Sequence, residues 1–227
     1  MQLLTDLGFQ LIPPSSKRWK SRPQIMIVLH GQGDSLDPFL SLPHELELPE
    51  MHYLLVNAPE AYEGGYQWYA SEPRHKKGIE ASRKKLTLLI DDLIEQGWPS
   101  ESIFLFGLSQ GGLMAFHVAM TYPKKLGGVV GVSTYVYFPQ MWEKLVKPFH
   151  KKIPMIMTHG FKDKDIPLKE AYADMRKLQS VGMPVQWFEF NKGHEVETDF
   201  ETSFLGNWLR HQVDSKDPVK EKLKHGK

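Results

Sequence analysis

Short apolar runs alternate with amphipathic segments along most of the chain. The runs predict strands at Phe9–Ile12, Gln24–His30, His52–Ala58, Ile103–Leu108, Gly128–Ser133, Pro154–His159 and Val185–Phe190. Apolar residues spaced along one helical face predict helices over Ile79–Gln96 and Leu168–Ser180, and a last helix around Phe200–Trp208. Runs that are apolar throughout are typical of strands buried on both faces. We therefore predict an α/β fold, with a mostly parallel central sheet and helices on both faces.

The length and composition fit a single domain of this kind. The chain has 227 residues, of which 41% are hydrophobic and 24% charged, as in ordinary globular proteins. We predict one domain over residues 1–213, followed by a lysine-rich tail over residues 214–227 with too few apolar residues to fold. The stretch between the predicted strands Gly128–Ser133 and Pro154–His159 is too short for a separate lid domain.

Charge and cysteine content exclude several classes of function. The 28 basic and 27 acidic residues nearly cancel, so no overall field attracts nucleic acid. The absence of cysteine excludes disulfides, thiolate metal sites and a cysteine nucleophile. No apolar run is long enough to cross a bilayer, and no signal peptide is expected at the start of the chain. We expect a cytoplasmic protein without a membrane span.

One serine lies on a glycine-rich turn between a predicted strand and a predicted helix. Residues Gly107–Gly111 read G-L-S-Q-G, which matches the pattern G-x-S-x-G. They follow the apolar run Ile103–Phe106 and precede the apolar run Leu113–Met120. This strand–turn–helix context is the setting of a nucleophile elbow, and the alternative is an ordinary turn with an exposed serine. Ser109 is the candidate nucleophile.

A serine hydroxyl needs a base to take its proton, and in this fold a histidine follows the serine along the chain. The histidines after Ser109 are His117, His150, His159, His194, His211 and His225. Among these, His194 follows the predicted strand Val185–Phe190 through a short loop, at the strand end where α/β sheets place ligands. His194 is the candidate base, and the alternative is a loop histidine that only precedes a helix.

Two aspartates compete for the role of the acid that orients the imidazole. Asp163 and Asp165 both follow the predicted strand Pro154–His159. Spacing alone does not separate them, because one can orient the histidine while the other shapes the loop or caps the next helix.

The tetrahedral intermediate also needs hydrogen-bond donors for its oxyanion. One is expected to be the backbone N–H of Gln110, and the second should come from the loop His30–Asp34, whose glycines permit close backbone approach. This loop is incomplete as a dinucleotide signature, so we discount nucleotide binding. His30 itself fits a structural role better than a catalytic one.

Four motifs occur in order along the chain: H-G-Q-G-D at residues 30–34, G-L-S-Q-G-G at 107–112, H-G-x-x-D-x-x-I-P at 159–167 and G-H at 193–194. Together they resemble the phospholipase/carboxylesterase family of α/β hydrolases, which includes acyl-protein thioesterases and small bacterial carboxylesterases. The resemblance covers about Gln24 to Val213. It implies an α/β-hydrolase fold, Asp163 as the acid, and the backbone N–H of Gln32 as the second oxyanion donor.

The chain departs from the family pattern near the expected substrate pocket. Gln32 stands where the family usually has a hydrophobic residue, and a Trp-Phe-Asp-like motif reads Trp68-Tyr69-Ala70 without the acid. Thioesterase substrate preferences therefore do not carry over directly. The aromatic and Met residues on predicted loops near the rim are Trp68, Tyr69, Tyr135, Tyr137, Phe138, Met141 and Trp142. We single out Trp68 as the candidate substrate-binding residue.

These residues predict a serine hydrolase that needs neither metal nor cofactor and cleaves carboxylic esters or thioesters through an acyl-enzyme. Without a lid, short to medium acyl chains or an acyl group on a bulky carrier, such as an acylated protein, are favoured. We expect a monomer or homodimer that acts on a small ester or acyl-thioester. The alternatives are a catalytically silent binding protein with the same fold, and a peptidase.

Overall fold

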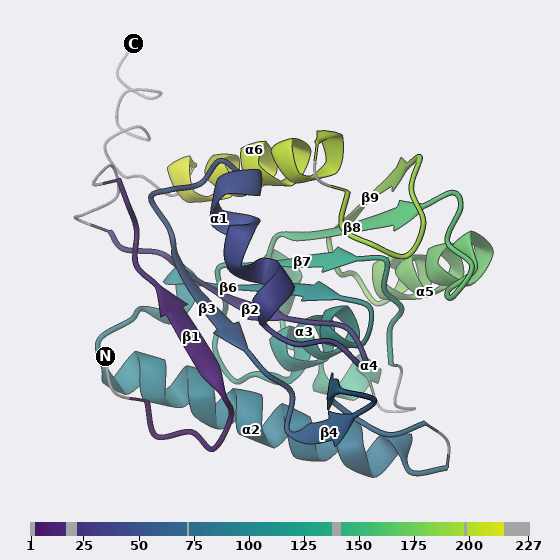
Figure 1. The fold of residues 1–227 in the computed structure, drawn as a ribbon, viewed down its shortest axis with the longest axis horizontal. Helices are drawn as coiled ribbons and strands as arrows, with labels where there is room; N and C mark the ends of the chain where they lie inside the picture. Colours follow the sequence, from purple (N-terminus) through teal and green to yellow (C-terminus); the bar gives the residue numbers. More distant parts are fainter. Residues whose placement is uncertain (1–2, 17–21, 72, 138–141, 198, 216–227) are drawn as a thin grey trace.

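The computed structural model describes residues 3–16, 22–71, 73–137, 142–197 and 199–215. At its centre is a seven-stranded sheet in the order β1-β3-β2-β6-β7-β8-β9 (Figure 1). The strands are β1 (Phe9–Ile12), β2 (Ile25–Leu29), β3 (His52–Val56), β6 (Ile103–Leu108), β7 (Gly128–Val132), β8 (Met155–Gly160) and β9 (Val185–Phe190). Neighbouring strands are parallel except the edge pair β1 and β3. The predicted mostly parallel sheet is confirmed.

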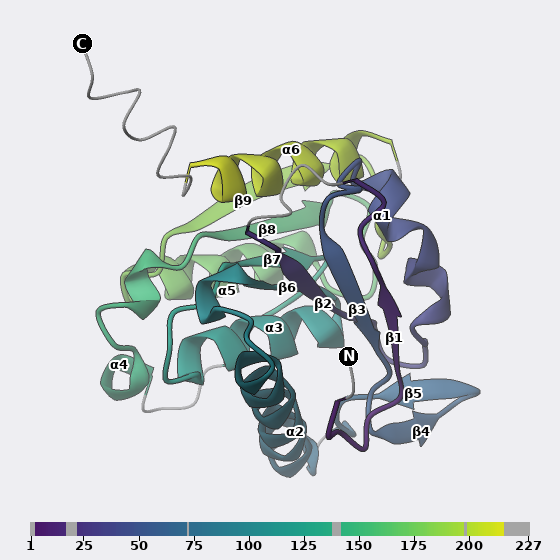
Figure 2. The ribbon, with the colours of Figure 1, turned by 90° about the vertical axis from the view of Figure 1, so that its left-hand side faces the viewer.

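Helices cover both faces of the sheet, as predicted. The longer helices are α2 (His75–Glu95), α3 (Gln110–Thr121), α5 (Leu168–Ser180) and α6 (Phe200–Asp214). The shorter elements are α1 (Leu42–Glu45), α4 (Trp142–Leu145) and the 3-10 turns Asp37–Ser41, Ser100–Ser102 and His150–Lys152. Figure 2 shows α1 and α6 on one face of the sheet and α2 and α3 on the other. The strands β4 (Glu60–Tyr62) and β5 (Gly65–Gln67) form a separate hairpin.

The burial of the central strands explains the two layers. All five residues of β2 are buried, and they alternate between two apolar cores. Ile25, Ile27 and Leu29 belong to the core beneath α2, α3 and α5. Met26 and Val28 belong to the core beneath α1 and α6. A strand covered on both faces must be apolar at every position, which is why the predicted strands read as continuous apolar runs.

The longest helix starts earlier than its hydrophobic pattern indicates. α2 begins at His75, whereas the apolar stripe begins only at Ile79. The first turn holds no large apolar residue, so periodicity has nothing to detect there. The buried residues of α2 are Ile79, Ser82, Leu86, Leu89, Ile90 and Leu93. They form the predicted stripe against the sheet.

Two regions bear on the expected domain limits. Between β7 and β8 the described residues form only α4 and the 3-10 turn His150–Lys152, while residues 138–141 lie outside the description. α6 ends at Asp214, and residues 216–227 of the predicted tail also lie outside the described residues. None of the helices in the described part of the chain has the length and apolar character that crossing a membrane requires.

Candidate active site

Ser109 lies on a strained turn between β6 and α3. Its backbone has φ 53° and ψ −118°, a conformation that residues other than glycine rarely adopt. Neighbouring groups hold this conformation in place. The N–H of Ser109 donates to the carbonyl of Val132 at 3.0 Å, and the Thr134 hydroxyl donates to the Ser109 carbonyl at 2.7 Å. Such strain persists only where the surroundings over-determine it, and it is typical of functional sites.

The glycines around Ser109 are required by close backbone approach. A Cβ atom on Gly107 would lie 2.2 Å from the carbonyl oxygen of Gly111. A Cβ atom on Gly111 would lie 2.1 Å from the carbonyl oxygen of Leu29 in β2. No side chain fits at such distances, so the G-x-S-x-G pattern follows from the packing of α3 against β6 and β2.

The structure brings Asp163 and His194 together at the ends of two neighbouring strands. His194 Nδ1 lies 2.8 Å from Oδ2 of Asp163, so a proton on Nδ1 is donated to the carboxylate. Oδ1 of Asp163 accepts the N–H groups of Asp165 at 3.0 Å and of Ile166 at 2.9 Å. Burial opposes ionisation, but the N–H of Ile166 and the imidazole of His194 outweigh it and lower the pKa of the Asp163 carboxyl.

The two aspartates have different places in this arrangement. Asp163 is buried and bonded to His194, whereas Asp165 is exposed and contributes its backbone N–H to the turn that Asp163 caps. Asp163, Asp165 and His194 also offer three atoms within 4.8 Å of one another, a donor set that could hold a divalent cation. Both oxygens of Asp163 already accept N–H groups, so a cation would have to compete with His194.

A second histidine contacts the same carboxylate. His159 is fully buried, and its Nε2 lies 2.9 Å from the carbonyl oxygen of Ile166 and 3.3 Å from Oδ2 of Asp163. Its ring stacks on Trp187 with centroids 5.8 Å apart. Burial lowers the pKa of His159, which favours the neutral ring with its proton on Nε2. The sequence places His159 and Asp163 in one motif, but the motif does not reveal that the His159 ring contacts the carboxylate.

Gln32 and Gln110, the residues of the two predicted oxyanion donors, line the same cavity as Ser109. Gln110 opens α3, where the first backbone N–H groups have no acceptor within the helix. Its side chain is tied down: Oε1 accepts the N–H of Trp68 at 3.1 Å, and Nε2 donates to the Tyr69 carbonyl at 3.0 Å. The Gln32 side chain donates to Oε1 of Gln67 at 3.1 Å, in the β4–β5 hairpin.

His30 has a structural role. Its Nε2 accepts the N–H of Ala58 at 3.0 Å, so the proton sits on Nδ1, which lies 2.6 Å from the Gly31 carbonyl. The ring is buried, and burial lowers its pKa. His30 thus ties the end of β2 to the segment after β3, as its sequence position suggests.

The expectation for Trp68 has to be corrected. The side chain is fully buried, and it lines neither cavity of the site. Its indole N–H donates to the His30 carbonyl at 2.9 Å. Trp68 therefore packs against the start of the loop formed by residues 30–34 and is not exposed for contact with a substrate. Of the other rim candidates, Phe138 and Met141 lie outside the described residues, as does the side chain of Trp142.

Two adjoining cavities meet beside the serine. The larger has a volume of about 680 Å³, and Ser109, His194, Gln32 and Gln110 line it. The described charged residues that line it, His194 apart, are all acidic: Asp34, Asp165, Glu170 and Asp174. The smaller, of about 310 Å³, shares Gln32, Gln110 and Tyr135 with the larger. Its other lining residues are mostly apolar or aromatic: Tyr69, Ser71, His75, Ile79, Leu113, Val136 and Tyr137.

Comparison with known proteins gives a consistent family and fold. A model of the phospholipase/carboxylesterase family matches residues 15–205. An acyl-protein thioesterase 1 of Gibberella zeae is 28% identical over 182 residues, covering 77% of each chain. A probable inactive carboxylesterase of Oryza sativa subsp. japonica is 26% identical over 216 residues, covering 87% of each. The crystal structure of Arabidopsis thaliana SOBER1, 23% identical, superimposes with a TM-score of 0.77 over 85% of this chain and all of that one.

Proposed function

The chain belongs to the phospholipase/carboxylesterase family of α/β hydrolases, and from this premise we propose that it is a serine hydrolase of carboxylic esters or thioesters. The observation that supports this most strongly is the 2.8 Å contact between His194 Nδ1 and Asp163 Oδ2, in a site whose cavity also contains Ser109. A histidine oriented by a buried carboxylate next to a serine on a strained turn matches the requirements of acyl transfer.

The proposed reaction has two halves. In the first, Ser109 Oγ attacks the acyl carbon while Nε2 of His194 takes its proton, and then returns it to the departing oxygen or sulfur. Asp163 keeps the other ring proton on Nδ1 and stabilises the imidazolium. The backbone N–H groups of Gln32 and Gln110 bind the oxyanion. In the second half, His194 activates a water that releases the acyl group as a carboxylic acid.

The two cavities suggest where the two parts of a substrate lie. The acyl chain fits the smaller, more apolar cavity beside Gln32 and Gln110, because its walls include Ile79, Leu113 and Val136. Its volume of about 310 Å³ is near the lower end of ligand pockets, which favours short to medium acyl chains. The leaving group, whether a small alcohol, a small thiol or the side-chain thiol or hydroxyl of a protein that loses its acyl group, then occupies the larger cavity.

The acidic lining of the larger cavity argues for leaving groups without negative charge. Four acidic residues line that space, and like charges disfavour an anionic group there. The negative charge of Asp174 is partly offset, because its carboxylate accepts the N–H of Val136 and pairs with Lys177. Neutral or cationic thiols and alcohols should therefore be better leaving groups than a phosphate-bearing carrier such as coenzyme A.

A panel of substrates tests this function. We expect p-nitrophenyl esters and neutral acyl-thioesters of two to eight carbons to be hydrolysed by the wild-type protein and not by Ser109→Ala, with acyl-coenzyme A less reactive than the neutral thioester of the same acyl group (roughly tenfold, or ~1.4 kcal/mol). Hydrolysis of no ester or thioester by a folded protein would instead favour a silent binding protein. One relative is named as inactive, which makes this control necessary.

A further inference from the structure

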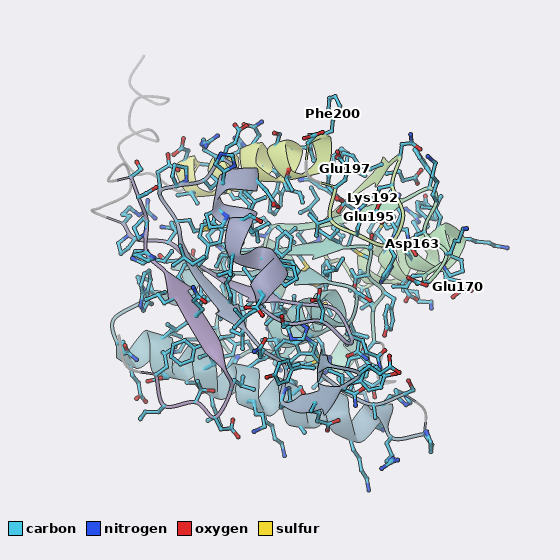
Figure 3. The ribbon with its side chains drawn as sticks, in the orientation of Figure 1. Asp163, Glu170, Lys192, Glu195, Glu197 and Phe200 are labelled. Carbon is cyan, nitrogen blue, oxygen red and sulfur yellow. The ribbon has the colours of Figure 1, made fainter. Side chains whose placement is uncertain are left out.

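A buried ion pair lies behind the loop that carries His194. The ammonium of Lys192, two residues before the histidine, donates to Oε2 of Glu201 at 2.6 Å. Both side chains are almost completely shielded from solvent, with 1% and 0% exposed. Glu201 belongs to the first turn of α6, so the pair joins the end of β9 to the helix that follows. Figure 3 shows Lys192 next to Glu195, between the start of α6 and Asp163.

The same ammonium also bonds to the backbone on the far side of His194. Lys192 Nζ also donates to the carbonyl oxygen of Glu195 at 2.6 Å, so one side chain spans the residues on both sides of His194. The carboxylate of Glu195 accepts the N–H of Gly193 at 2.8 Å, which adds a second closure of this loop. These bonds of the Lys192 and Glu195 side chains act on the backbone around His194 in addition to its backbone contacts with the end of β8.

The backbone of Lys192 reaches the other loop of the site. Its carbonyl accepts the N–H of Lys162 at 3.0 Å, immediately before Asp163. Lys192 thus contacts both loops whose side chains form the His194–Asp163 hydrogen bond. A shift of Lys192 would change the position of one loop relative to the other.

Glu201, the partner of Lys192, makes further hydrogen bonds at the N-terminus of α6. Oε2 of Glu201 accepts the N–H of Glu197 at 2.9 Å in addition to the ammonium. The Glu197 carboxylate in turn accepts the N–H groups of Phe200 at 2.9 Å and Glu201 at 2.7 Å, at the N-terminus of α6. Negative charge is favourable at that end of a helix. Glu201 is therefore a fixed point for the lysine.

Burying a pair of charged side chains costs free energy, because both ions lose their hydration. The desolvation of two ions is seldom recovered in stability, and apolar residues of similar volume often serve as well. Burial lowers the pKa of Lys192, while the carboxylates of Glu201 and Glu195 oppose that change. What the pair provides that an apolar contact cannot is a directed bond to the Glu195 carbonyl.

We propose that Lys192, anchored by Glu201, is a positioning residue that sets the location of the His194 imidazole relative to Ser109 and Asp163. This proposal rests on the proposed hydrolase function. The lysine touches no reacting atom; it acts through the loop that it closes. Loss of its bonds lets the loop relax, and a displacement of about 1 Å at a reacting group can lower the rate about 100-fold.

The test replaces both charges together. Lys192→Met alone leaves the Glu201 carboxylate buried without its cation, so that variant is expected to lose stability. Lys192→Met/Glu201→Gln removes both charges, keeps similar side-chain volumes and leaves an amide oxygen to accept the N–H of Glu197. The matched control is Lys125→Met/Glu101→Gln, which removes an ion pair of 3.1 Å whose side chains are partly exposed.

Three measurements are compared: kcat and KM for a p-nitrophenyl ester, the thermal midpoint Tm, and the downfield proton NMR signal of the His194–Asp163 hydrogen bond. We expect the folded double variant to lose about 10- to 100-fold in kcat, with KM within about threefold and the downfield signal broadened or lost. The control pair should match wild type in all three. Destabilisation alone would lower Tm without moving the signal in the folded protein.

A folded double variant with wild-type kcat and an unchanged downfield signal overturns the proposal. Failure of the hydrolase function itself has a different signature. In that case the wild-type protein neither hydrolyses the ester nor reacts with a fluorophosphonate. The NMR signal still reports in that case whether Lys192 positions the imidazole.

Discussion

The serine turn and the histidine loop line the same cavity, but buried charges help to hold only the histidine loop. Ser109 follows β6, an interior strand of the sheet with β2 and β7 on its two sides, and the turn is fixed by backbone contacts that exclude any Cβ on Gly107 or Gly111. His194 follows β9, an edge strand paired only with β8. Its loop also has close backbone contacts, since a Cβ on Gly160 would lie 2.3 Å from the Lys192 carbonyl oxygen, but it is held in addition by charged side chains, above all the buried pair of Lys192 and Glu201.

The difference has a physical consequence. Steric constraint around the nucleophile does not depend on ionisation, because it comes from close packing of the backbone. The positions of His194 and Asp163 depend on which groups carry charge, because the bonds of Asp163 and Lys192 are strongest when these groups are a carboxylate and an ammonium. We therefore expect a small group added at Gly111 to cost more than one added at Gly193, and changes of charge to damage the histidine loop more than the serine turn.

The largest effect is expected from removing the nucleophile. Ser109→Ala should lower kcat by about 10⁴-fold or more, because only the attacking oxygen is lost and the backbone contacts of the turn remain. Ester hydrolysis and circular dichroism of wild type and variant check both parts of this statement. Retention of more than about a tenth of the activity would show that another residue is the nucleophile.

The next largest effect separates the two aspartates. Asp163→Asn removes the acceptor of the His194 Nδ1 proton and favours the wrong tautomer, so kcat should fall by about 10⁴-fold, the scale of the same change in the serine protease triad that serves as the reference case. Asp165→Asn should leave kcat within about tenfold, because the Asp165 side chain is exposed and only its N–H binds Asp163. Steady-state rates of ester hydrolysis by the two variants and the wild type at pH 8 check this prediction. A reversed order would contradict the assignment of the acid.

Two glycine substitutions compare the regions directly. Gly111→Ala places a Cβ 2.1 Å from a backbone carbonyl that cannot move, so unfolding free energy should fall by roughly 3 kcal/mol or more. Gly193→Ala places a Cβ 2.7 Å from Oε2 of Glu195, the end of a flexible side chain, and should cost about 1 kcal/mol or less. Urea unfolding of both variants provides the numbers. Equal losses would remove the steric distinction between the two regions.

Acid should weaken the fold through buried histidines of both regions. Burial lowers the folded-state pKa of His30, at the end of β2, and of His159, which contacts Asp163. The unfolded chain binds protons below about pH 6.5 while these rings stay neutral in the fold, so the free energy of unfolding falls as the pH drops through that value. Unfolding free energies at pH 7.5 and 5.5 test this. Equal or greater stability at pH 5.5 would contradict it.

The smallest effect concerns metal ions. Asp163, Asp165 and His194 are close enough to hold a cation, but both Asp163 oxygens already accept N–H groups. Treatment with EDTA should therefore leave ester hydrolysis unchanged. Activity that is lost on chelation and restored by zinc or manganese would show that the acid serves as a metal ligand.

Sequence predicts the steric region well and the charged region poorly. The glycines that flank Ser109 are close neighbours in the chain, so their G-x-S-x-G pattern can be recognised within five residues of sequence. Asp163 and Asp165 could be separated only by family resemblance, because both follow the same strand at similar spacing. The partnership of Lys192 with Glu201 depends on how α6 docks after β9, which no local pattern encodes. The substrate-binding role that the sequence predicts for Trp68 is wrong for a related reason. Loop composition does not reveal which aromatic side chains are buried, and the Trp68 side chain is fully buried.

Covalent labelling tests most directly whether Ser109 is an activated nucleophile. A fluorophosphonate forms a bond between its phosphorus and the serine Oγ, with loss of fluoride, when a base activates that oxygen. Intact-protein mass spectrometry and peptide mapping locate the adduct. We predict one label for each chain, on Ser109, absent from Ser109→Ala and formed much more slowly in His194→Ala. No adduct on the folded wild-type protein, or an adduct on a different serine, would contradict the proposed mechanism.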